Sequence, residues 1–128
     1  MATTTRIERP APQIADLPAG TLVVTRPLPQ LDCIPARTGV VVEAWGPDET
    51  ATVLVWFWAL GAPESSRSIH ILFPVEIYTL DVTLDAMPEG AFRSIERKLA
   101  AYGDTLADAL APVAEAVAAA RAERDRRR

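Results

Sequence analysis

The chain has 128 residues, 49% of them hydrophobic, and a formal net charge of −4. These values are typical of one globular domain and exclude a largely disordered chain. No apolar run approaches the roughly 20 residues of a membrane span, so we expect no contact with a membrane. The single cysteine, Cys33, excludes an internal disulfide bond and favours a cytoplasmic location.

Residues 1–20 contain Pro10, Pro12 and Pro18 and few large apolar side chains. Proline removes backbone donors and favours extended chain, so we expect a flexible N-terminal arm over residues 1–20.

Five short segments rich in β-forming residues follow, separated by turns that contain glycine or proline. Pro27, Pro29 and Pro35 exclude a paired strand over residues 27–36, and residues 46–50 have the composition of a hairpin turn. The spacing predicts a small antiparallel barrel or sandwich over residues 21–82. The expected strands are Thr21–Arg26, Thr38–Trp45, Ala51–Leu60, Arg67–Phe73 and a fifth from Val75 to Leu80 or Val82.

The third of these segments is apolar on both faces. Leu54, Trp56 and Trp58 alternate with a second apolar set at positions 53, 55 and 57, so the two sets point to opposite sides. A half-exposed strand would carry polar residues on one side. We therefore expect one face to be covered by the interior of the sheet and the other by the chain's own helices or by a partner.

From residue 88 the apolar spacing becomes helical. We expect a C-terminal helical segment over residues 86–128 with an arginine-rich end. Pro88 and Glu89 suit a helix start, and Gly103 suits a helix end. Pro112 should either kink a second helix or restart it. The apolar stripe comprises Phe92, Ile95, Leu99, Tyr102, Leu106, Ala109, Val113, Ala116 and Ala120.

The sequence contains no catalytic or cofactor motif. No glycine-rich phosphate loop occurs, and one cysteine with one histidine cannot form a zinc site, so we expect no enzymatic activity, cofactor or metal. Two alternatives stay open. One is a nucleophile pair of Cys33 and His70, and the other is an acid–base pair drawn from Glu43, Glu76, Asp81 and Asp85.

Aromatic and basic residues suggest two kinds of contact. Trp45, Trp56 and Trp58 could bind a peptide or stack on bases, or fill the core, with Trp45 the most exposed because it ends a strand. The arginine-rich end could touch a polyanion, or match the negative end of a helix. The acidic remainder of the chain makes nucleic-acid binding the less favoured choice.

The predicted elements of residues 21–80 follow one another in a recognisable order. An early strand is followed by a long irregular connection, the Gly39-Val40-Val41 start of a hairpin, a tryptophan-bearing strand and the turn at Phe73-Pro74-Val75. This pattern resembles small SH3-like β-barrels. The resemblance covers about half of the chain, implies a five-stranded antiparallel barrel there, and fixes no function. Together with the C-terminal helices predicted from the helical spacing, the expected fold class is α+β, a small five-stranded SH3-like antiparallel β-barrel followed by C-terminal helices. The acidic loop and exposed tyrosines of peptide-binding SH3 domains are missing, so recognition of proline-rich ligands is not expected.

We therefore expect a non-enzymatic protein-interaction or assembly module that serves a larger complex or a homo-oligomer. A nucleic-acid-associated accessory protein and a small enzyme subunit with an unrecognised site are the alternatives. The expected interface residues are Trp45, Trp56, Trp58, Phe92, Ile95, Leu99, Tyr102, Leu106 and Val113, and the possible polyanion contacts are Arg121, Arg124, Arg126, Arg127 and Arg128.

Overall fold

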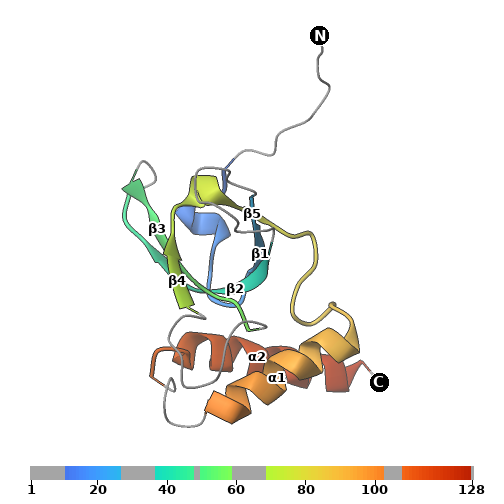
Figure 1. Cartoon of the computed structure of the whole chain (residues 1–128). Helices are drawn as coiled ribbons and strands as arrows, with labels where there is room; N and C mark the ends of the chain where they lie inside the picture. The colour runs from blue at the N-terminus through green and yellow to red at the C-terminus, as the bar shows by residue number, and fades with distance from the viewer. Residues whose placement is uncertain (1–10, 27–36, 48–49, 59–68, 103–107, 128) are drawn as a thin grey trace.

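A five-stranded antiparallel sheet followed by two helices places the chain in the α+β class (Figure 1). The structure is a computed structural model that describes residues 11–26, 37–47, 50–58, 69–102 and 108–127. The strands are hydrogen-bonded in the order β4-β3-β2-β1-β5, and no pairing of β4 with β5 closes a barrel within these ranges. The elements are η1 (Ile14–Asp16), β1 (Leu22–Thr25), β2 (Thr38–Trp45), β3 (Thr52–Trp56), β4 (Ile69–Leu72), η5 (Pro74–Glu76), β5 (Ile77–Thr79), α1 (Glu89–Tyr102) and α2 (Ala111–Arg126).

The strand predictions hold for all five segments, with β2 matching its expected bounds. Two strands are shorter than expected: β3 ends at Trp56, before Phe57 and Trp58, and the last strand begins at Ile77 rather than at Val75. Pro74 fixes the first position of the 3₁₀ turn η5, and the Phe73 amide donates to the Glu76 carboxylate at 2.8 Å. This local closure ends β4 and delays β5 by two residues. Residues 59–60 and 67–68 of the expected strands lie outside the described residues.

Both faces of β3 are covered, as the sequence predicts. Val53, Val55 and Phe57 lie in one core, to which all five strands contribute. Trp56 and Trp58 lie in a second core, shared between the sheet and the two helices. The chain therefore covers the second face with its own helices, and these side chains do not need a partner.

The segment expected to be a flexible arm is ordered from residue 11 onward. It forms η1, and Leu17 directly after η1 is only 2% exposed because it packs in the first core beside Val23 and Ile77. The prediction of a flexible arm that extends to residue 20 is therefore wrong. The reason is that Leu17, a large apolar side chain among the prolines, packs into the core. Residues 1–10 lie outside the described residues.

The helical segment is a hairpin of two helices rather than one kinked helix. Pro112 lies in the first turn of α2, where its missing N–H disturbs no helical hydrogen bond, so this residue restarts the helix. Phe92, Ile95, Val113 and the last buried alanine, Ala120, face the sheet. The two helices lie at one end of the sheet, whereas η5 and the hairpin end of β2 and β3 lie at the other (Figure 1).

Gly20, in the turn before β1, lies close to α2. Its backbone has a φ of +95°, and a Cβ atom placed on it would lie 2.6 Å from the Ala116 Cβ atom. Both features require glycine, since other residues rarely adopt this φ and Cβ atoms do not come so close. The close contact between residues 19–21 and α2 therefore depends on this residue.

We predict that Gly20→Ala lowers the free energy of unfolding by about 1–3 kcal/mol, through backbone strain and the clash with Ala116. Gly90→Ala is the matched control, because its added Cβ meets no atom within 4 Å and alanine favours the helix. Denaturant unfolding of both variants measures the difference. Equal stabilities for the two variants would contradict the close approach of α2 to the sheet.

Candidate functional site

Most of the expected interface residues are buried inside the chain. Trp56, Phe92, Ile95 and Val113 are fully enclosed, Trp58 is 8% exposed, and Leu99 packs partly buried against the same core. Assigning them to an interface with another protein is therefore wrong, because the sheet and helices of this chain cover one another. The side chains of Tyr102 and Leu106 lie outside the described residues.

Among the residues that the structure describes, four large apolar side chains are open to solvent at the end of the sheet away from the helices. Trp45 is 44% exposed, Ile71 67%, Phe73 55% and Val75 65%. We call these four residues the β4 patch. Only Trp45 was expected from the sequence. A sequence feature that could have indicated Ile71 and Phe73 is the alternation of Ile69, Ile71 and Phe73 along a segment that ends at a proline.

The strand register places Trp45, Ile71 and Phe73 of the β4 patch on one face of the sheet. Trp45 lies opposite Thr52, and Leu54 lies opposite Ile71. Phe73 continues the extended backbone of β4, with a φ of −101° and a ψ of 150°. Because side chains two residues apart share a face, Ile71 and Phe73 point to the same side as Trp45.

The helices cover only part of this same face. Trp56 and Ile69 lie opposite each other on β3 and β4, and both pack against the helical core. Two residues further along β4, Ile71 is two-thirds exposed. Trp45, Ile71 and Phe73 thus form the uncovered continuation of the buried face, and Val75 adjoins them from η5.

A hollow of about 480 Å³ opens beside the patch. Its walls include Pro12, Gln13, Thr50, Ala51, Phe73 and Val75. The ordered segment that follows residue 10 therefore forms one wall, and η5 forms another. The hollow is large enough to take the side chain of a bound molecule.

A second hollow, of about 460 Å³, lies between α2 and the segments around residues 19–22 and 80–85. Leucine, valine and alanine side chains line most of it. Its two carboxylates, from Asp85 and Glu123, both pair with Arg127, with an Asp85 Oδ2 to Arg127 Nη2 distance of 2.6 Å. These acids are already engaged within the chain, and the hollow contains no acid–base pair.

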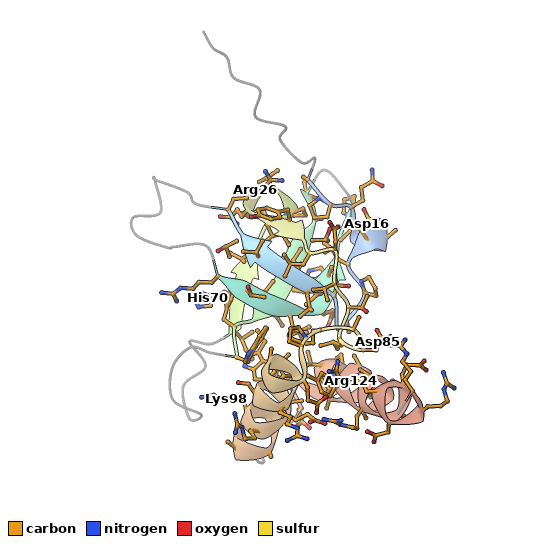
Figure 2. All side chains as sticks on the ribbon, turned by 90° about the vertical axis from the view of Figure 1, so that its right-hand side faces the viewer. Asp16, Arg26, His70, Asp85, Lys98 and Arg124 are labelled. Carbon is orange, nitrogen blue, oxygen red and sulfur yellow. The ribbon has the colours of Figure 1, made fainter. Side chains whose placement is uncertain are left out.

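The described part of the arginine-rich end folds back onto α1. Arg121 makes two hydrogen bonds to the Glu96 carboxylate, at 2.6 and 3.0 Å, and a third to Glu89 at 3.1 Å. Arg124 donates to Glu89 at 3.0 Å and to the backbone oxygen of Leu84 at 2.9 Å. Figure 2 shows Arg124 and Asp85 in this region, between α2 and the segment that leads into α1.

The aromatic ring of Phe92 lies beneath these arginines. The guanidinium carbons of Arg121 and Arg124 lie 4.9 and 4.7 Å from the ring centroid, within the range of cation–π attraction. Both arginines are therefore part of the helix–helix contact. Arg126 and Arg127 pair with Glu123, and Arg128 lies outside the described residues.

These ion pairs change the acidity of the groups involved. Hydrogen bonds from Arg93, Arg124 and Arg121 lower the pKa of Glu89 from 4.5 to about 2. Hydrogen bonding to Arg121 lowers the pKa of Glu96, and the Glu96 carboxylate in turn raises the pKa of Arg121. Bonds from Thr83 and Arg127 lower the pKa of Asp85.

The two contacts expected for a nucleic-acid-binding protein are not brought together. Trp45 lies at the hairpin end of β2, and the arginines lie on the helices at the opposite end of the sheet. Four of the five arginines are paired with carboxylates, so their charges are largely neutralised. This arrangement does not form one continuous surface for a nucleic acid.

The residues considered for catalysis are also separated. His70 is exposed on β4 and packs edge-on against Phe57, with the ring centroids 5.4 Å apart. Cys33 lies outside the described residues. Glu76 caps η5 at one end of the molecule, whereas Asp85 pairs with Arg127 at the other.

No cluster of three metal-ligating side chains occurs within the ranges that the structure describes. Over the same ranges, no helix has the length and apolar character needed to cross a membrane.

Comparison with known proteins identifies a family without assigning a function. Residues 1–125 match the model of a family described as "Family of unknown function (DUF6409)". The chain belongs to this family. No curated protein and no solved structure matches the chain. Because the DUF6409 match spans the sheet and nearly all of α2, the helical layer is part of the family unit rather than an addition to it.

We predict that Glu89→Gln lowers the melting temperature at pH 7, because the glutamine side chain cannot form ion pairs with the three arginines. The folded-state pKa of Glu89 lies below its usual value, so its stabilisation is present above about pH 4.5 and is lost as the pH falls toward about 2. The difference between wild type and variant should therefore shrink over that range. Thermal unfolding followed by circular dichroism measures it.

Glu115→Gln, on the exposed side of α2, is the control, and its melting temperature should stay close to that of the wild type. A Glu89→Gln difference that is the same at pH 7 and pH 3 would exclude the ion pairs as its cause.

Proposed function

We propose that the protein is a non-enzymatic protein-interaction module, an accessory part of a larger complex, and that it docks through the β4 patch. The observation that supports this is the exposure of Trp45, Ile71, Phe73 and Val75 beside a hollow, on a face whose other end is buried. Exposed apolar patches of this kind mark interaction sites in soluble proteins.

The size of the patch favours another protein over a second copy of this chain. Its four side chains expose on the order of 400 Å² of apolar surface. A stable interface between two folded proteins buries about 800 Å² on each partner. The patch is about half that size, which suits a small docking element of a different protein.

Two further parts of the proposal concern the fold family of the sheet and the cellular location of the protein. We propose that the sheet is SH3-like, since β5 pairs with β1 at one edge and η5 occupies the expected turn before the last strand. A cytoplasmic location is supported by the presence of a single cysteine.

We predict that Ile71→Ser weakens the capture of a specific partner from an extract of the native host by at least tenfold, because it removes the most exposed apolar side chain of the patch. Ala118→Ser, at an exposed position of α2, is the control and should capture the same partner as the wild type. The captured protein is identified by mass spectrometry, purified and titrated against all three forms.

A partner that binds wild type and Ile71→Ser equally would exclude the β4 patch as the docking site. Light scattering of the purified chain tests the second-copy alternative. We expect the mass of a single chain at micromolar concentration, and a dimer that Ile71→Ser dissociates would overturn the choice of partner.

A further inference from the structure

The edge of the sheet beside the patch has the geometry of an acceptor for an added strand. Among the described strands β4 has one neighbour, β3, with pairs from Val53–Leu72 to Trp56–Ile69. An edge strand presents backbone donors and acceptors on its outer side. The backbone amide and carbonyl of Phe73 are hydrogen-bonded to Glu76, so the residues available for pairing are the four of β4, Ile69–Leu72, whose outward-facing groups lie at alternate positions.

The side chains along this edge alternate in a way that suits an extended segment. Ile71 and Phe73 are exposed on the patch face, whereas Leu72 packs partly buried against the first core. A strand added to β4 would place every second side chain beside Ile71 and Phe73. The hollow lined by Phe73 and Val75 lies at the end of this row and offers a place for one further apolar side chain.

The limited area of the β4 patch also favours an extended segment as the bound partner. Main-chain hydrogen bonds to an edge strand supply affinity that a small apolar area cannot supply alone. The exposed carboxylate of Glu43 on the same face and the net charge of −4 disfavour an acidic segment.

We propose that β4 binds its partner by strand addition, taking up one extended segment of another protein that has apolar residues at alternate positions and no excess of acidic residues. This inference rests on the proposed function, because it specifies how the β4 patch is used. Ile71 and Phe73 contact the alternate side chains, and the outer backbone groups of β4 pair with the segment's backbone.

The probe for this proposal is a phage-displayed library of random 12-residue peptides, selected on the full chain. We expect enriched peptides with apolar residues at every second position and a Kd at least tenfold weaker for Ile71→Ser than for wild type or Ala118→Ser. The best peptide is then synthesised with one backbone N-methyl group at each position in turn. N-methylation removes the donor at that position.

Strand addition predicts that the effect of the N-methyl groups alternates. Positions whose N–H faces β4 should weaken binding by tenfold or more, and the positions between them should change it by less than about threefold. Hydrogen exchange of the outward-facing amides among residues 69–72 should slow when the peptide binds.

The outcomes separate this proposal from the proposed function. Peptides that depend on Ile71 but show no alternation, with unchanged exchange of the β4 amides, would overturn strand addition and leave the patch as the docking site. A selection that yields no binder, or only binders insensitive to Ile71→Ser, would overturn both.

Discussion

The apolar character of both faces of β3 is the constraint on which the rest of the structure depends. A strand of this kind needs cover on each side, and the chain provides it in two ways. The curled sheet encloses Val53 and Val55, and the helical hairpin lies over Trp56. The helical hairpin reaches only one end of the second face. Ile71, at the other end of that face, therefore stays exposed.

The helical hairpin is held to the sheet by apolar packing, and its two helices are joined by a charged cluster. Arg121 and Arg124 lie over the ring of Phe92 while their guanidinium groups bind the carboxylates of Glu89 and Glu96. Arginines near the end of α2 thus pair with Glu89 at the start of α1 and with Glu96 in its middle, and these ion pairs link the two helices. The positive charges in the described part of the arginine-rich end are therefore paired with carboxylates of the same chain.

Much of the fold could be predicted from the sequence, because the deciding signals are local. A valine-rich run defines β2, the period of two separates the two faces of β3, and Pro112 indicated an interruption that the structure shows to be the start of α2. The candidate site could not be predicted in the same way. Whether Ile71 or Trp56 is exposed depends on where the hairpin lies on the sheet, and two apolar residues on one face look alike in sequence. The pairing of Arg121 with Glu96, 25 residues away, likewise appears only once the hairpin has formed.

The central claim is that the helices cover one end of the sheet face that carries Trp56, while the other end, at the β4 patch, is open to solvent. Oxidative footprinting of the folded chain tests this claim most directly. Trp45 and Trp56 have the same intrinsic reactivity, so their relative rates report exposure alone. The account predicts rapid labelling of Trp45 and Phe73, and protection of Trp56 and Phe92 until the chain unfolds. Labelling of Trp56 as fast as Trp45 would show that the helices do not cover the sheet, and protection of Trp45 and Phe73 would show that the β4 patch is not open.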